Sequence, residues 1–81
     1  MKVHIRLFAV AKQLAGAEVI TLVLPAGSTL AELRCALAVE VPTLASVLPQ
    51  VLFAVGSEYA DDDTVISAES EVACIPPVSG G

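Results

Sequence analysis

The residues best suited to chemistry lie at the end of the chain, in the sequence Pro76-Pro77-Val78-Ser79-Gly80-Gly81. Proline fixes φ at about −65° and lacks an N–H, so Pro76 and Pro77 predict a stiff, extended spacer. Glycine has no Cβ and fits slots that exclude other residues. A free α-carboxyl is ionised at neutral pH and can attack an activated phosphate. We therefore expect the carboxylate of Gly81 to be the reactive group; the alternative is an idle terminus.

Other candidate reactive residues are better explained by structure. The run Asp61-Asp62-Asp63 lacks the spacing of a calcium loop and is interpreted as a solvated loop. His4 is the single histidine, and we expect it to be a hydrogen-bonded surface residue. Cys35 and Cys74 have neither metal-ligand nor CxxC spacing, so both are interpreted as reduced packing residues of a cytosolic protein. The five glycines form no phosphate loop. We therefore expect no metal site, and any nucleotide would have to be held by a partner.

The composition indicates a protein that works through partners. A chain of 81 residues makes one small domain with little room for an enclosed active site. Hydrophobic residues make up 56% of it, more than one small core can hide, and exposed apolar side chains commonly mark partner surfaces. The net charge of −5 disfavours nucleic acids and anionic membranes. Neither a membrane span nor a signal peptide is predicted, so we expect a cytoplasmic location.

Hydrophobic periodicity predicts a set of short strands and one main helix. Strands are expected over residues 2–8, 19–24, 51–55 and 71–75, with a brief strand at 65–66. A short helix is expected over 10–14, ending at Gly16. Thr29 and Glu32 form a capping box that begins an amphipathic helix of about three turns, which Pro42 ends. Tyr59 and the acidic run after it are expected to form a polar loop.

These elements predict a single α+β domain. One helix laid across one face of a small mixed sheet is the arrangement of the ubiquitin-like β-grasp fold. In that topology the first and last strands pair in parallel at the centre of the sheet. We therefore predict a β-grasp domain over residues 1–75 and a projecting, extended tail over 76–81, aimed by the most buried strand.

Three segments carry a resemblance to a known family. They are Leu7-Phe8-Ala9 with the short helix that follows, Phe53-Ala54-Val55 with Glu58-Tyr59, and the final run from Glu71 to Gly81. Together they resemble the small subunit of molybdopterin synthase, a family of ubiquitin-like sulfur carriers, over nearly the whole chain. Gly56 stands where the family often has Asn, and Ala68-Glu69-Ser70 where it often has Asp-Gly-Asp. Both departures lie at turns and bear on loop geometry more than on function.

The resemblance implies a sulfur-transfer cycle. An activating adenylyltransferase related to those of ubiquitin pathways would use ATP to adenylate Gly81, and a sulfur donor would convert the adenylate to a thiocarboxylate. The large subunit of molybdopterin synthase, expected as a 2+2 heterotetramer with this chain, would then receive the tail and pass sulfur to cyclic pyranopterin monophosphate. This chain alone is expected to bind no cofactor.

The resemblance also implies that Phe8, Lys12, Tyr59 and Ile75 lie on the face that docks both partners. The alternative for Phe8 and Tyr59 is ordinary packing.

Other functions remain open at the level of sequence. An activated carboxyl on Gly81 could acylate lysine side chains, as in a ubiquitin-like protein modifier. The chain could instead carry sulfur for thiamine or for tRNA thiolation, or be an interaction module with an idle tail. The Pro-Pro-Val-Ser segment favours the molybdopterin synthase family over these.

Overall fold

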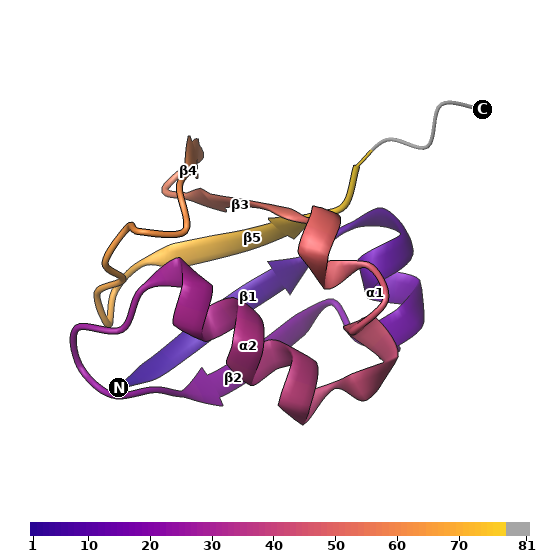
Figure 1. The fold of residues 1–81 in the computed structure, drawn as a ribbon, viewed down its shortest axis with the longest axis horizontal. Coiled ribbons are helices and arrows are strands. Elements are labelled where there is room, and N and C mark those ends of the chain that lie inside the picture. Colours follow the sequence, from indigo (N-terminus) through magenta and orange to yellow (C-terminus); the bar gives the residue numbers. More distant parts are fainter. Residues whose placement is uncertain (78–81) are drawn as a thin grey trace.

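The chain forms one mixed β-sheet in a computed structural model that describes residues 1–77. The strands are β1 (Lys2–Leu7), β2 (Val19–Val23), β3 (Leu52–Val55), β4 (Glu58–Ala60) and β5 (Glu71–Ile75). They lie in the order β2-β1-β5-β3-β4 (Figure 1). β1 and β5 run parallel, with His4 aligned to Glu71 and Leu7 to Cys74, and the other neighbouring strands are antiparallel. The predicted parallel pairing of the first and last strands is confirmed.

Helices cover one face of this sheet (Figure 1). They are α1 (Ala9–Ala15), α2 (Leu30–Glu40) and the short 3-10 helices η1 (Pro42–Leu44) and η2 (Leu48–Gln50). The predicted capping box begins α2, because Thr29 Oγ1 accepts the Glu32 N–H at 3.3 Å and the Glu32 carboxylate accepts the Thr29 N–H at 3.2 Å. Among residues 1–77, no helix has the length and apolar character that crossing a bilayer requires.

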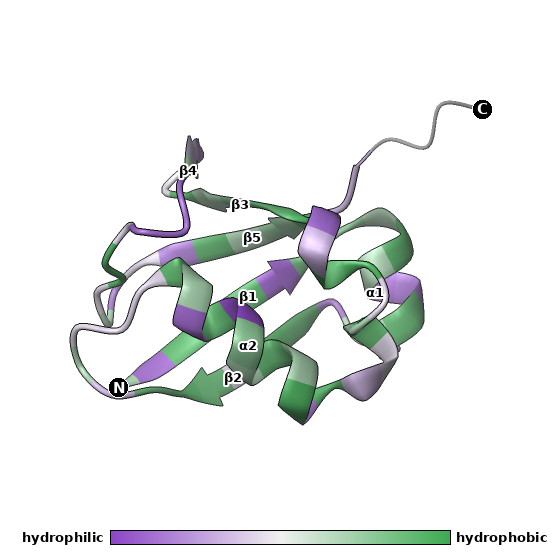
Figure 2. Ribbon diagram, in the orientation of Figure 1, coloured by the Kyte–Doolittle hydropathy of each residue, from purple (hydrophilic) through white to green (hydrophobic). Residues whose placement is uncertain are grey.

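The core lies between the helices and the sheet. Alternate residues of β1 and one stripe of α2 are buried there: Val3, Ile5, Leu7, Leu30, Leu33 and Leu37. The other residues of β1, Lys2, His4 and Arg6, are exposed, and Figure 2 shows this alternation as purple and green bands along the strand. One face of the sheet is therefore filled by the helical layer, and the opposite face is open.

Four details differ from the sequence-based prediction. Tyr59 lies on β4 and not in a loop, because residues 58–60 pair antiparallel with β3. Phe8 follows the first strand as the N-cap of α1, and Val65 forms an isolated bridge with Thr29 in place of a strand. Cys35 is exposed on α2 because it lies outside the buried stripe of leucines, so its interpretation as a packing residue was wrong; Cys74 is buried as predicted.

The turn between β3 and β4 accounts for one departure from the family pattern. Its two central residues, Gly56 and Ser57, have φ angles of 58° and 74°. Two left-handed residues in succession make the type I′ connection that suits the twist of a hairpin. Glycine takes this conformation at no steric cost, and asparagine is among the side chains that tolerate it best. Gly56 therefore meets the requirement of this turn position for a positive φ, which asparagine can also meet.

Candidate functional site

β5 leads the chain to the predicted reactive tail. It pairs with β1 on one side and with β3 on the other, so two hydrogen-bonded ladders fix its direction. Ile75 ends the strand opposite Leu52 of β3, Pro76 is buried and Pro77 is exposed. The remaining tail residues Val78, Ser79 and Gly80, and the predicted reactive residue Gly81, lie outside the described residues. The predicted tail thus begins at the end of a central, doubly paired strand.

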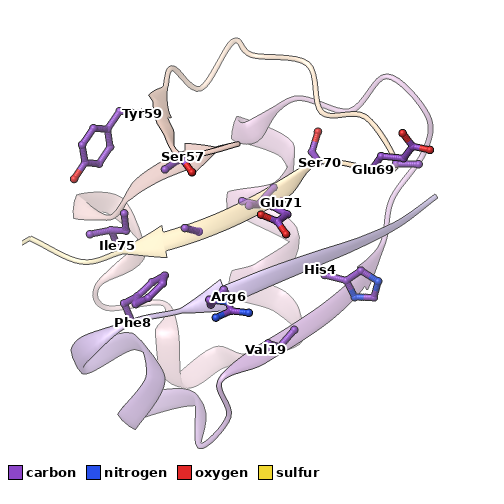
Figure 3. Close-up of a pocket in the computed structure, with 14 residues that line it drawn as sticks. His4, Arg6, Phe8, Val19, Ser57, Tyr59, Glu69, Ser70, Glu71 and Ile75 are labelled. Carbon is purple, nitrogen blue, oxygen red and sulfur yellow. The ribbon is translucent and has the colours of Figure 1, made fainter.

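The open face of the sheet carries a hollow of about 780 Å³, which we call the sheet-face hollow (Figure 3). Its middle is formed by two small side chains, Ala54 of β3 and Ala73 of β5, which are aligned neighbours in the sheet. Arg6 is aligned with Ala73 on the β1 side, and Tyr59 with Ala54 on the β4 side. Because the two methyl groups are short and the flanking side chains are long, the surface is depressed between them.

Three of the four predicted docking residues line one end of this hollow. Phe8, Tyr59 and Ile75 come from the start of α1, from β4 and from the end of β5, and Figure 3 shows them grouped together. Phe8 is 42% exposed and Tyr59 is 68% exposed. Aromatic side chains with so much accessible surface are available to a partner, and grouped apolar exposure commonly marks a protein-binding site.

Lys12, the fourth predicted docking residue, does not line the hollow. It lies on α1, where its Nζ is 2.9 Å from Glu18 Oε1. This hydrogen bond and the positive charge of Lys12 hold the pKa of Glu18 below its usual range. The structure therefore groups Phe8, Tyr59 and Ile75 at the hollow and places Lys12 outside it, one turn of α1 after Phe8, whose carbonyl oxygen accepts the Lys12 backbone N–H at 3.4 Å.

The opposite end of the sheet-face hollow is polar. His4 Nδ1 lies 2.9 Å from Thr21 Oγ1, which confirms the predicted hydrogen-bonded surface histidine. Glu71 is aligned with His4 across the central pair, and Arg6 and Glu69 also line the hollow (Figure 3). The hollow thus combines a depressed shape, apolar area and charges of both signs. These are properties of a recognition surface for another protein.

The remaining candidate reactive groups have structural explanations. Cys74 lies in the core, and burial raises the pKa of its thiol to about 11 against a smaller lowering by Arg34, so the thiol is protonated at neutral pH. Both cysteines are free. The acidic run is exposed, as predicted, and its Asp62 is ion-paired with Arg34. Within residues 1–77, no three His, Cys, Asp or Glu side chains gather in a way that could hold a metal.

Sequence reasoning missed the role of Arg34. Its Cζ lies 4.8 Å from the centroid of the Phe53 ring, and Nη2 is 2.7 Å from Asp62 Oδ1. Nη1 donates to the carbonyl oxygens of Leu48 and Val51, the latter at 2.8 Å. One guanidinium thus links α2 to η2, to the start of β3 and to the acidic loop. The available signal was an arginine within an otherwise mostly apolar helix, which does not reveal these distant partners.

Sequence reasoning also missed Leu52, Ala54 and Ala73. Leu52 is 56% exposed and is aligned with Ile75, so it extends the apolar area where β5 ends. The two alanines matter because they are small, and a small residue on a strand gives no signal until its neighbours are known. The position of Leu52 was predictable, because alternation along residues 51–55 places its side chain on the sheet face opposite that of the buried Phe53.

A mixed sheet with parallel β1 and β5 at its centre, helices on one face and the chain leaving from β5 defines a ubiquitin-like β-grasp protein. Within that class the chain belongs to the ThiS family, whose family model matches residues 5–81. The molybdopterin synthase sulfur carrier subunit of Arabidopsis thaliana is 36% identical over 81 residues, which span all of this chain and 84% of that protein.

Solved structures show the same fold. SAMP1 of Haloferax volcanii, a small archaeal modifier protein, matches with a TM-score of 0.88 and 25% identity over the full length of both chains. A chain in the complex of subunits 1 and 2 of the molybdopterin-converting factor of Helicobacter pylori matches with a TM-score of 0.71 and 26% identity, again over both full lengths.

Proposed function

We propose that this chain is the sulfur-carrier subunit of a molybdopterin synthase. The observation that carries the proposal is the 36% identity, over the whole chain, to a relative named for that role. The family match extends through residue 81 and so includes the glycines of the predicted tail. Within residues 1–77 the sheet-face hollow supports the proposal, because a carrier must be recognised by other proteins.

The proposed chemistry begins at the carboxylate of Gly81. An activating enzyme that holds ATP joins this carboxylate to AMP and releases pyrophosphate. A donor of sulfide-level sulfur then displaces AMP, so that the C–O bond to phosphate breaks and a C–S bond forms. The product is a thiocarboxylate, whose sulfur displaces an oxygen substituent of cyclic pyranopterin monophosphate in the active site of the large subunit and so forms a thioester. Water then cleaves the acyl C–S bond, which leaves the sulfur on the pterin and restores the carboxylate of Gly81.

In this proposal the folded domain binds the partners and directs the tail. Phe8, Tyr59 and Ile75 contact the large subunit, and β5 directs residues 76–81 into its active site. The match to a chain from a complex of two converting-factor subunits supports a large-subunit partner. We propose that two copies of this chain and two copies of the large subunit form a heterotetramer. We propose that the same face meets the activating enzyme. The two free thiols are consistent with a cytoplasmic location.

Intact-mass spectrometry of the protein purified from cells that contain its native partners tests the carrier role. We expect a species heavier by the difference between one sulfur and one oxygen atom, and we expect it to revert on incubation with the large subunit and the pterin. The matched control is the chain lacking Gly81, which should fold normally and gain no sulfur. Pterin sulfuration by that truncated chain would contradict the proposal.

A protein modifier is the second candidate, favoured by the structural match to SAMP1. A modifier would use the same activated carboxyl to acylate lysine amines. It predicts a ladder of larger conjugates that persists in denaturant and disappears when Gly81 is deleted. A sulfur-loaded species without such a ladder supports the carrier role alone.

A further inference from the structure

The two edges of the sheet differ in how they are protected against pairing. Edge strands expose unpaired backbone groups, and proteins usually blunt them with short length, charge or proline. β4 is three residues long, begins with Glu58 and is followed by three aspartates. β2 is five residues long, and its sequence Val-Ile-Thr-Leu-Val contains neither charge nor proline. Figure 2 shows it in mainly apolar colours. The edge of β2 is therefore the unprotected one.

The backbone of β2 presents a defined set of hydrogen-bonding groups at this edge. Leu24 donates its N–H to Met1 O at 2.9 Å, and Glu18 O accepts the Leu7 N–H at 2.8 Å. Because backbone groups alternate in direction along a strand, residues 18, 20, 22 and 24 face β1. The N–H and C=O groups of Val19, Thr21 and Val23 then point to the outer edge, where no strand formed by residues 1–77 pairs with them.

We propose that this edge pairs with β2 of a second copy of the chain in an antiparallel, two-fold symmetric contact. The sequence of β2 is nearly the same in both directions about Thr21. A two-fold axis at Thr21 aligns Thr21 with its own copy and Val19 with Val23 of the other copy. All three outward residues of each strand then exchange N–H···O=C bonds, which gives six hydrogen bonds across the contact.

The side chains fit the same register. Val23 is 76% exposed and Val19 is 46% exposed, and both lie on the open face of the sheet. In the symmetric pair each Val23 packs beside a Val19 of the other copy, and the two threonines form a favourable cross-strand pair. A shift by two residues would place valine opposite threonine, and so would lose both Val–Val contacts and at least two hydrogen bonds. The register with Thr21 on the axis therefore gives the most hydrogen bonds and the most Val–Val contacts.

The contact joins two sheets into one and leaves the sheet-face hollow on the same side in both copies. A two-fold axis perpendicular to the sheet keeps both helical layers on the opposite side. A five-residue edge covers much less than the roughly 1,200 Å² of a stable complex, so we expect a dissociation constant on the order of 1 mM. The dimer therefore forms at high local concentration and is independent of the proposed sulfur chemistry.

Amide hydrogen exchange and translational diffusion, measured by NMR on the full chain from about 0.02 to about 2 mM, test the proposal. The amides of Ile20 and Leu22, which face β1, should be protected at every concentration. The amides of Thr21 and Val23 should gain protection only as the concentration rises, while diffusion slows. Exchange that is the same at both ends of the range would overturn the proposal. Protection of these amides only when the large subunit is added would assign the edge to that partner and also overturn it.

Val23→Lys should weaken the dimer without unfolding the chain. It places a cation on the exposed edge, beside Lys2 of its own copy and near Arg6 of the other. We expect the dissociation constant to rise about tenfold or more. The matched control is Val39→Lys, since Val39 is 81% exposed and belongs to α2, not to the strand that would form the contact. Equal association of the two variants would overturn the edge assignment.

Discussion

Replacing Arg34 with methionine should lower the free energy of unfolding by roughly 3–4 kcal/mol. The Arg34 guanidinium donates to two carbonyl oxygens, those of Leu48 and Val51, and the arginine side chain is 19% exposed. A hydrogen bond from a charged donor contributes roughly 1.5–3 kcal/mol, and a carbonyl left without a partner in a part-buried site loses that contribution. Methionine keeps the apolar stem in place, so the loss reports on the guanidinium.

The other contacts of the guanidinium contribute less. Asp62 is half exposed, so its ion pair is worth less than about 1 kcal/mol. The contact with the Phe53 ring adds about 0.5–1 kcal/mol. Arg34 Nε is buried without a hydrogen-bond partner among the described residues, and the cost of burying it is recovered when the side chain is replaced. The two carbonyl bonds therefore dominate the expected loss.

The expected loss is large for a domain of this size. A chain of 81 residues has a stability of roughly 4–12 kcal/mol, so the variant should lose a quarter or more of it. Urea denaturation followed by circular dichroism measures the change directly. In thermal melts the midpoint should fall by roughly 12–30 °C.

Two companion variants separate the contributions at Arg34. Arg34→Lys keeps the charge but has no planar fork, so it can satisfy one carbonyl and should lose about half as much stability. Asp62→Ala removes the ion pair alone and should cost less than about 1 kcal/mol. If Arg34→Met and Asp62→Ala destabilise the fold equally, the carbonyl bonds do not carry the effect and the reasoning is refuted.

Three further predictions concern the surface and the titratable groups. Phe8→Ala and Tyr59→Ala should each raise the dissociation constant for the large subunit about tenfold or more, as measured by calorimetry. The melting temperature should change little because both side chains are exposed. An unchanged affinity with a lower melting temperature would show that these side chains serve packing instead. A thiol reagent such as Ellman's should modify one cysteine, Cys35, in the folded chain and Cys74 only in denaturant, and two rapidly reacting thiols would contradict the burial of Cys74. Lys12→Ala should raise the pKa of Glu18 toward its ordinary value of 4.5, measured by NMR titration. The pKa of Glu18 is lower in the folded chain than in the unfolded chain. The Lys12–Glu18 pair therefore stabilises the fold fully above pH 4.5, and this stabilisation is lost as the pH falls through the folded pKa. The small stability difference between wild type and variant should accordingly vanish in acid.

The fold followed from the sequence because its signals are local. Alternation in residues 2–7, the capping box at Thr29 and Glu32, and the proline after the main helix each act within a few residues. The parallel pairing of β1 and β5 is a long-range feature, but few topologies allow a single main helix to cover a small mixed sheet. Tyr59 was misassigned because a two-residue turn at Gly56-Ser57 leaves a strand too short to show a period.

The candidate site was only partly predictable because its shape depends on contacts between distant strands. Phe8 and Ile75 were assigned to a docking face by resemblance, and the structure places both at the sheet-face hollow. The floor of the hollow depends on the alignment of Ala54 with Ala73, which brings together two strands that are well separated in sequence. Arg34 is similar, since its three hydrogen-bond partners lie 14 to 28 residues away along the chain. Side-chain identity alone does not encode such distances.

Ile75 couples recognition to the reach of the predicted tail. It lines the sheet-face hollow and is also the last residue of β5, so a partner that covers the hollow contacts the base of the tail. From Ile75 to Gly81 there are six peptide units, which span at most roughly 20 Å when fully extended. Because β1 and β3 hold β5 on both sides, docking cannot slide this base along the sheet without breaking two ladders. Any reaction centre that acts on Gly81 must therefore lie within about that distance of Ile75 in the docked complex, whichever enzyme supplies it.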